Sequence, residues 1–269
     1  MEQTIDLSIG VIDKLKQLVK EIGSMQRQNL GRTNLAVAQK STSIDLVTEI
    51  DKKSEEQIIA FLQDHYPAHS FLAEESGETG GDSDYLWIID PLDGTTNYAQ
   101  GLPIFTISIA LNYQGKPVLG MVYAPVLDEL YYAVKGQGAF LNDQPIHVSD
   151  KTQLIDSVLA TGFPYDVASH KANNTNHFNN LLLKTRAVRR FGSAAYDLAC
   201  AACGRFDGYW ELNLSPWDAA AGMLLVEEAG GMVLSFRDDR KVSIIAGNKA
   251  IVNEIWMEIK QLEDEDNNI

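Results

Sequence analysis

Apolar residues at helical spacing predict two helices in the part of the chain that precedes Pro67. The first prediction rests on Ile5, Ile9, Ile12, Leu15, Val19 and Ile22. The second helix is expected within "DLVTEIDKKSEEQIIAFLQDHYP", after a short extended piece, with Ile58, Ile59 and Leu62 on its apolar face. Both patterns repeat every three to four residues, as one buried face of a helix requires.

The pattern then changes to short β-branched and aromatic runs. "SFLAEES" and "YLWIID" read as strands, and the stretch from Phe105 to Ile146 contains "FTISIALNY", "KPVLGMVYAP", "ELYYAVK" and "GAFLN". Turn residues separate these runs, which predicts an antiparallel meander. After residue 150 the predicted strands alternate with helices. We therefore expect an α+β first half, residues 1–150, and an α/β second half, residues 151–269, stacked in layers around a shared cleft.

Composition and charge narrow the function classes. The chain has 269 residues, is 45% hydrophobic and carries a formal net charge of −15, which argues against non-specific binding to nucleic acid or anionic membranes. No apolar run reaches the roughly 18 residues of a membrane span. The first residues lack the basic start and apolar centre of a signal peptide. A cytoplasmic enzyme or binding protein is expected.

Cysteine and histidine give little support for a soft-metal or redox site. Cys200 and Cys203 form one C-x-x-C pair in a small-residue helical pattern, without a second pair. A packing role is therefore favoured over redox chemistry or zinc binding. The five histidines are scattered without the spacing of metal ligands.

The stretch "WIIDPLDGTTN" is the first candidate for chemistry. A strand leads into Asp90 and Asp93, and Pro91 between them fixes a turn that allows both carboxylates to converge. Two carboxylates in close contact repel each other unless a cation lies between them. Oxygen ligands alone favour Mg²⁺, Mn²⁺ or Ca²⁺. Gly94 would let backbone approach an anion, although Asp-x-x-Asp-Gly alone is more typical of a capped surface turn.

Three further motifs have both a structural and a functional interpretation. Glu74 and Glu75 follow a strand and would usually form a solvated loop. Asp218 in "SPWDAAAGM" suits a helix cap, since acidic residues complement the helix dipole in the first turn. In "RRFGSAAYDL", Gly192 and Ser193 either cap a helix or place its N-terminus near an anion.

Taken together, these segments resemble a known family. "WIIDPLDGTTN" and "PWDAAAG" are similar to the two signatures of the inositol monophosphatase family, and "DLVTEID", "FLAEES", "TGFPYD" and "GSAAYDLACAACGRFDGYWE" resemble its other blocks in order and spacing. The resemblance covers about residues 5 to 260. It implies a layered αβαβα sandwich of the sugar-phosphatase type and a Mg²⁺-dependent phosphoric monoester hydrolase, an inositol-1-monophosphatase.

The resemblance also implies roles for individual residues. The metal ligands fall on Glu74, Asp90, Asp93, Asp218 and the carbonyl of Leu92. The phosphate falls on the amides of Gly94 and Thr95, while Glu74, Thr95 and Asp51 match the groups that orient and deprotonate the attacking water. Substrate contacts fall on Gly94, Thr95, Gly192, Ser193, Ala194, Glu211 and Asp218. Lys40 matches a lysine near the site. Asp45, Glu75 and Asp197 lie beside these positions and are expected to support the structure or the ligands. Trp87 and Trp217 are expected to pack behind the site.

Cofactors, partners and rival functions follow from the same resemblance. It implies two or three Mg²⁺ ions per site, with Mn²⁺ as a substitute, inhibition by Li⁺ and Ca²⁺, and a homodimer. Related enzymes hydrolyse fructose 1,6-bisphosphate, histidinol phosphate, NADP(H) or 3′-phosphoadenosine nucleotides. Such substrates call for an additional basic pocket, for which Arg189 and Arg190 form the nearest cluster. Some bacterial relatives bind the transcription machinery, so a non-catalytic protein-binding scaffold is the alternative of a different class.

Overall fold

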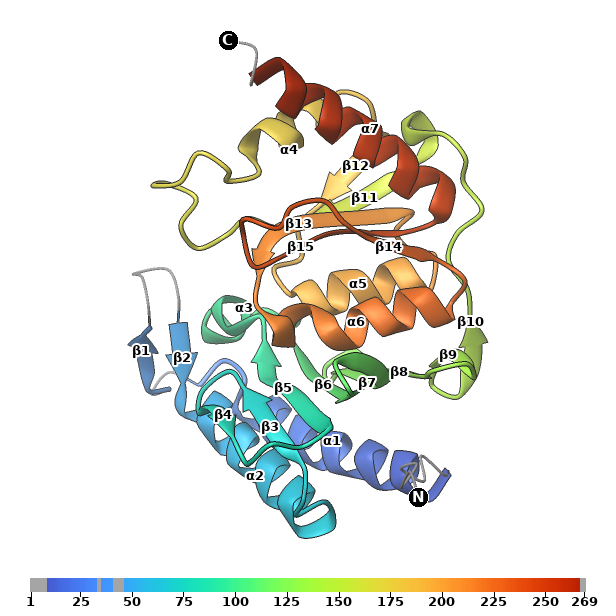
Figure 1. The fold of residues 1–269 in the computed structure, drawn as a ribbon. Helices are drawn as coiled ribbons and strands as arrows, with labels where there is room; N and C mark the ends of the chain where they lie inside the picture. The colour runs from blue at the N-terminus through green and yellow to red at the C-terminus, as the bar shows by residue number, and fades with distance from the viewer. Residues whose placement is uncertain (1–8, 33–34, 41–45, 267–269) are drawn as a thin grey trace.

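The computed structural model describes residues 9–32, 35–40 and 46–266. Their helices and sheets stack in five layers (Figure 1). Ile5 and Asp45 lie outside the described residues. Helices α1 (Ile9–Asn29) and α2 (Glu49–His65) form one outer layer, against an eight-stranded sheet. Helices α5 (Ala194–Ala202) and α6 (Pro216–Glu228) form the central layer. A five-stranded sheet and then α4 (Thr175–Leu182) and α7 (Lys249–Asp266) complete the stack. The predicted αβαβα order is confirmed.

The eight-stranded sheet contains the predicted meander. Its strand order is β10-β9-β8-β7-β6-β5-β3-β4. The strands are β3 (Ser70–Ala73), β4 (Gly77–Thr79), β5 (Tyr85–Asp93), β6 (Thr106–Tyr113), β7 (Lys116–Ala124), β8 (Glu129–Val134), β9 (Gly138–Leu141) and β10 (Gln144–Ile146). Strands β5 to β10 pair antiparallel with their sequence neighbours, whereas β3 and β5 are parallel. Since β3 and β5 are parallel, the residues that follow them meet at one edge of the sheet.

The second sheet is mixed and has the order β12-β11-β13-β15-β14. Its strands are β11 (Val158–Thr161), β12 (Ala187–Arg189), β13 (Gly208–Leu214), β14 (Met232–Ser235) and β15 (Val242–Gly247). A small hairpin, β1 (Val37–Gln39) with β2 (Leu46–Thr48), and the short segments α3 (Thr95–Ala99) and η1 (Leu154–Asp156) complete the fold. Division of the chain into two subdomains near residue 150 stays a prediction.

Small residues bring the central helices close to the first sheet and to each other. A Cβ on Gly120 of β7 would lie 2.7 Å from the carbonyl oxygen of Ala221 in α6. A Cβ on Gly222 would lie 2.5 Å from the Cβ of Leu198 in α5. Glycine at both positions therefore permits the close contact. Through this packing, the N-termini of α5 and α6 meet the end of β5.

The same helix packing accounts for the cysteines. Cys200 is buried in the cluster of small residues on α5, and burial raises the pKa of its thiol to about 12. A buried thiol of high pKa is a poor nucleophile and metal ligand, which supports the packing role. Within the described residues, no helix has both the length and the apolar character needed to cross a membrane.

Candidate metal centre and substrate cavity

The end of β5 is irregular in a way that brings two carboxylates together. Asp90 pairs with Ser108 of β6 and Asp93 pairs with Thr106, so three steps along β5 match two along β6. Residues three apart on a regular strand point to opposite faces. The extra residue of this bulge restores a common face. The amide of Gln26 also donates to the carbonyl of Pro91 at 2.8 Å and holds the turn in place.

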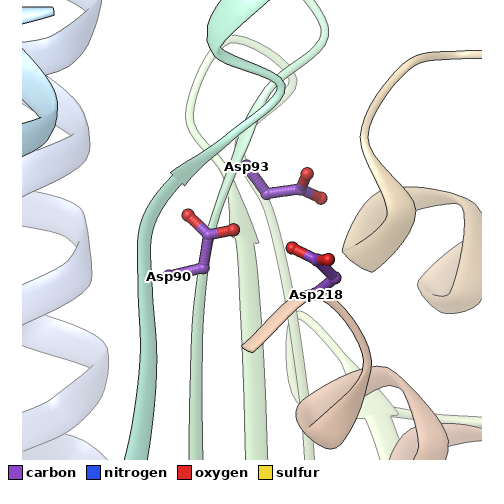
Figure 2. A group of neighbouring side chains, drawn as sticks. All are labelled: Asp90, Asp93 and Asp218. Carbon is purple, nitrogen blue, oxygen red and sulfur yellow. The ribbon is translucent and has the colours of Figure 1, made fainter. Parts of the chain in front are cut away.

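Asp218 joins the two aspartates from a different layer. One carboxylate oxygen from each of Asp90, Asp93 and Asp218 lies within 4.8 Å of the other two. Figure 2 shows the three side chains directed toward one another. Asp218 is fixed by its place in the first turn of α6, where its Oδ2 accepts a 2.6 Å hydrogen bond from the amide of Ser215. Sequence reasoning had to choose between a cap and a ligand at this position, and the geometry allows both.

Backbone and hydroxyl donors orient the other two members of the cluster. Asp90 Oδ1 accepts from the amide of Leu92 at 2.9 Å. Asp93 Oδ2 accepts from the hydroxyl of Ser193 and from the amide of Ala195, both at 2.7 Å. The N-terminus of α5 therefore holds Asp93, and each carboxylate keeps an oxygen directed into the cluster.

The electrostatics of the cluster fit a divalent cation. Burial and then the negative charges of Glu74, Asp93 and Asp218 raise the pKa of Asp90 well above its ordinary range. Burial also raises the pKa of Asp93 to about 6, although the hydrogen bond from Ser193 opposes that shift. Converging buried carboxylates are unfavourable when they are all ionised and no cation neutralises them. An all-oxygen donor set suits a hard cation such as Mg²⁺.

Glu74 reaches the same region from the end of β3 but stands outside the three-carboxylate cluster. Its Oε1 lies 2.7 Å from the ammonium of Lys40, which also forms an ion pair with Glu75. Two amides of this turn, those of Glu75 and Ser76, donate to Glu55 of α2 at 2.8 and 2.9 Å. The structure thus places Glu74 beside the cluster with Lys40 as its partner.

Asp51 and Thr95 form a direct pair. The Thr95 hydroxyl donates to Asp51 Oδ1 at 2.9 Å, and it lies 3.1 Å from the carbonyl oxygen of Leu92. Asp51 is buried at the start of α2 and also accepts from the amide of Thr48 at 3.0 Å. Burial raises the pKa of Asp51, while its hydrogen bonds with Thr48 and Thr95 lower it.

The turn after β5 requires glycine. Gly94 has φ of +98°, and a Cβ there would lie 3.1 Å from the carbonyl oxygen of Ile104 and 3.2 Å from that of Gly192. Other residues are strained in this conformation. The carbonyl oxygen of Gly192 lies this close to Gly94 because the loop that contains Gly192, Ser193 and Ala194 packs against the turn. All three line the same cavity as Gly94 and Thr95.

Glu211 lies in the wall of this cavity, which has a volume of about 450 Å³. It belongs to β13, is 8% exposed, and its Oε2 accepts a 2.6 Å hydrogen bond from the hydroxyl of Tyr209. Burial raises its pKa to about 7. Its carboxylate lies where a side chain on Gly162 would be: a Cβ there would come within 2.2 Å of Oε2. Gly162 is thus a site residue that sequence reasoning did not identify.

Other cavity residues were also missed or assigned only to packing. Asp197, expected to support the site, and Trp217, expected to pack behind it, both line the cavity, whereas Trp87 is fully buried away from it. Lys241 lines it as well, and no local motif marked this residue. Phe163 and Tyr165 were contained in "TGFPYD", so their position in a matching block was the available signal. Of the predicted site residues, Asp51 is the one that does not line the cavity, and it reaches the site through Thr95.

The layered fold and the buried carboxylates define an α/β protein with an acidic centre for a divalent cation beside a polar cavity. Comparison with models of protein families then matches residues 10–263 to the inositol monophosphatase family, and the chain belongs to this family. It is therefore a phosphatase-family protein with a candidate acidic metal site.

Individual relatives agree on the family and differ in their names. The chain is 41% identical to the inositol-1-monophosphatase of Mesorhizobium japonicum over 94% of its own length and 97% of that protein. It is 45% identical to the Nus factor SuhB of Pasteurella multocida over 85% of its length and 87% of that protein. The solved structure of the Thermotoga maritima IMPase matches with a TM-score of 0.86 at 34% identity, covering 96% and 99% of the two chains.

Proposed function

We propose that this protein is a Mg²⁺-dependent phosphomonoesterase that hydrolyses myo-inositol 1-phosphate to inositol and phosphate. The observation that carries this proposal is the convergence of Asp90, Asp93 and Asp218 on one point, in the same cavity as Glu211. The three aspartates suit cations and a phosphate, and Glu211 offers a carboxylate to the hydroxyls of a polyol.

In this proposal each predicted substrate-binding residue has a specific role. The amides of Gly94 and Thr95 receive the phosphate, and the loop of Gly192, Ser193 and Ala194 borders the ring. Glu211 accepts hydrogen bonds from ring hydroxyls, and Asp218 contacts the substrate. Phosphoryl transfer from a monoester depends on alignment and charge stabilisation more than on covalent assistance.

The attacking water is assigned to Glu74, Thr95 and Asp51. The Thr95 hydroxyl donates a 2.9 Å hydrogen bond to Asp51, so a lone pair of the same oxygen is available to accept a hydrogen bond from water. Glu74 lies at the edge of the cluster, and burial raises its pKa to about 7 in the absence of metal. A carboxylate at this edge would take the proton from the water that Thr95 orients.

We assign the metal ligands to Glu74, Asp90, Asp93, Asp218 and the carbonyl of Leu92, for two or three Mg²⁺ ions, with Mn²⁺ as a substitute and Li⁺ and Ca²⁺ as inhibitors. When bound, Mg²⁺ supplies positive charge for the phosphate and the leaving oxygen and makes water more acidic.

The test is phosphate release from inositol 1-phosphate with Mg²⁺, with EDTA and by the variant Asp93→Asn. We expect turnover with Mg²⁺, none in EDTA, and a loss of at least about 100-fold in kcat/KM in the folded variant. Full activity in EDTA would exclude the metal mechanism. Parallel rates on fructose 1,6-bisphosphate, histidinol phosphate, NADP(H) and 3′-phosphoadenosine nucleotides decide whether inositol phosphate is the preferred ester.

A second candidate function is binding to another protein, independent of catalysis. It is favoured by the relatives named Nus factor SuhB, which are 40 to 45% identical to this chain. A pull-down that captures the same partner with the wild type and with Asp93→Asn would support it. We also propose a homodimer, for which light scattering at two protein concentrations is the check.

A further inference from the structure

Asn174 is a buried residue, 2% exposed, that joins the two ends of the loop between β11 and α4. Its Nδ2 donates to the carbonyl of Gly162 at 2.6 Å and to the hydroxyl of Thr161 at 2.8 Å. Gly162 is the first residue after β11, and Asn174 is the last residue before α4. One side chain therefore closes this 162–174 loop at its base.

A third hydrogen bond attaches Asn174 to the neighbouring strand β13. The indole Nε1 of Trp210 donates to Asn174 Oδ1 at 2.7 Å. The hydroxyl of Thr161 in turn donates to the carbonyl of Trp210 at 2.6 Å. An indole nitrogen only donates and a carbonyl only accepts, so the contacts determine which amide atom faces which partner. Aspartate or leucine at this position could not supply both the acceptor and the two donors.

The side chain of Asn174 does not serve the helix that it precedes. An asparagine at a helix N-cap usually accepts a hydrogen bond from the first turn. Asn174 occupies the N-cap of α4 without such a bond, in the left-handed conformation with φ of +73°. Its polar atoms are instead directed to the ends of β11 and to β13. Helix capping therefore does not explain this residue.

Both backbone segments that Asn174 holds adjoin Glu211. Trp210 is the residue before Glu211 in β13, and Gly162 leaves the space that the Glu211 carboxylate fills. The four residues after Gly162, residues 163–166, line the cavity together with Glu211. Asn174 itself does not line the cavity. Any effect on the substrate must therefore pass through Gly162 and Trp210.

We propose that Asn174 is a positioning residue that holds the carboxylate of Glu211 in place, and that it thereby determines affinity for the polyol ring without affecting the reaction at the phosphate. This inference rests on the proposed phosphomonoesterase function and concerns the support of its substrate contact. The aspartates of the metal centre are held by other donors, the amide of Leu92 for Asp90 and the N-terminus of α5 for Asp93. Loss of Asn174 should leave those contacts unchanged.

The main variant is Asn174→Gly, because glycine keeps the left-handed backbone and removes only the side chain. Asn248→Gly is the matched control. Asn248 is also buried, 8% exposed, and stands before α7. Its Nδ2 donates to the carbonyl of Ser149 and its Oδ1 accepts from the amide of Ala250 at 2.8 Å, but it does not line the cavity.

The kinetic test compares inositol 1-phosphate with phenyl phosphate, an ester without hydroxyl groups for Glu211. In Asn174→Gly, KM for inositol 1-phosphate should rise about tenfold while kcat stays within about twofold of the wild type. For phenyl phosphate kcat/KM should not change, and Asn248→Gly should behave as the wild type with both esters. In a Glu211→Ala background, Asn174→Gly should raise KM no further, because both residues act on one contact. An equal loss with both esters, or additive effects with Glu211→Ala, overturns the positioning role.

Crystal structures of the metal-free variants test the position of Glu211 independently of turnover. In Asn174→Gly the carboxylate should be displaced by about 0.5 Å or more, and in Asn248→Gly it should stay in place. An unmoved carboxylate in Asn174→Gly overturns the inference. This measurement decides the inference even if the wild type hydrolyses neither ester, a result that would overturn the proposed function alone.

A milder pair of variants keeps the inference testable if Asn174→Gly does not fold. Thr161→Val removes one acceptor of Asn174 and the donor to the Trp210 carbonyl. It should raise KM for inositol 1-phosphate about threefold without changing kcat/KM for phenyl phosphate. Thr161→Ser keeps the hydroxyl and should restore the wild-type KM. A valine variant with the wild-type KM, or a serine variant that fails to restore it, overturns the inference.

Discussion

The hydroxyl of Thr95 donates a 2.9 Å hydrogen bond to Asp51 Oδ1, and so connects the turn after β5 to the first turn of α2. Asp51 also caps that helix through the amide of Thr48. One buried carboxylate therefore serves the helix and the site together. Its second role is invisible in the local sequence, where Thr48 and Asp51 look like an ordinary capping box.

Thr95→Val is expected to lower kcat by about 100-fold or more, because valine keeps the shape but cannot orient water or donate to Asp51. The unpaired carboxylate should also lower the free energy of unfolding by about 1–3 kcal/mol. Steady-state kinetics and urea unfolding in EDTA measure the two effects. Thr95→Ser restores the hydroxyl and should recover most of kcat. Equal kcat for the valine variant and the wild type would contradict the assigned role.

Asp90→Asn is expected to stabilise the metal-free protein while it weakens metal binding. In EDTA near pH 8 the substitution removes one of three converging carboxyl groups, which should raise the free energy of unfolding by on the order of 1 kcal/mol. Asn can still accept from the amide of Leu92 through Oδ1. In the wild type, Mg²⁺ at about 100 times its Kd should add about 2.7 kcal/mol.

Thermal unfolding with EDTA and with Mg²⁺ checks both parts of this prediction. The stabilisation by Mg²⁺ should nearly disappear in Asp90→Asn. Asp128→Asn is a suitable control, since Asp128 lies in the turn before β8, away from the cavity. A variant that is less stable than the wild type in EDTA would show that repulsion within the cluster is not the dominant effect.

The sequence predicted the layers, and it predicted most of the residues that line the candidate site, for different reasons. The helices and strands follow from local periodicity, as in α1 and the meander. The convergence of Asp90 with Asp218 could not follow from periodicity, because it depends on the bulge in β5 and on the packing of α6 against β7. Resemblance to the family supplied that long-range information.

The residues that sequence reasoning missed are those whose role depends on the tertiary structure alone. Gly162 looks like any glycine after a strand, and only the position of the Glu211 carboxylate shows why a side chain is excluded there. Lys241 lies in a charged turn without a motif, and only the tertiary structure shows that it lines the cavity. Gly162 lies in the matching block "TGFPYD", but nothing in that block indicates its contact with Glu211, and Lys241 lies in no such block.

Glu211 should make the stability of the metal-free protein depend on pH. Burial raises its pKa from 4.5 to about 7 in the folded state. The folded state therefore holds this proton more tightly, so its contribution to stability is fully present below about pH 4.5 and is lost as pH rises through about 7. The loss is up to about 3 kcal/mol. Glu211→Gln, which keeps an acceptor for Tyr209, removes this dependence.

Urea unfolding in EDTA at several pH values between about 4.5 and 8 measures the effect. The difference in unfolding free energy, wild type minus Glu211→Gln, should decrease steadily across this range. A constant difference would mean that Glu211 is already ionised at low pH in the folded protein. The same variant should raise KM for inositol 1-phosphate, because an amide is a weaker acceptor than a carboxylate for ring hydroxyls.

Gly162→Ala tests whether the position of Glu211, and not only its charge, determines substrate binding. The new Cβ would lie 2.2 Å from Oε2 and 2.4 Å from the carboxyl carbon, so the side chain must move away from Tyr209. We expect KM for inositol 1-phosphate to rise about tenfold, with a loss of about 1–3 kcal/mol in stability from overpacking. Gly81→Ala is the matched control, since nothing lies within 4 Å of its Cβ position and its φ is not positive. If Gly162→Ala binds substrate as the wild type does, Glu211 does not contact the ring from this position, because the substitution leaves no room for it there.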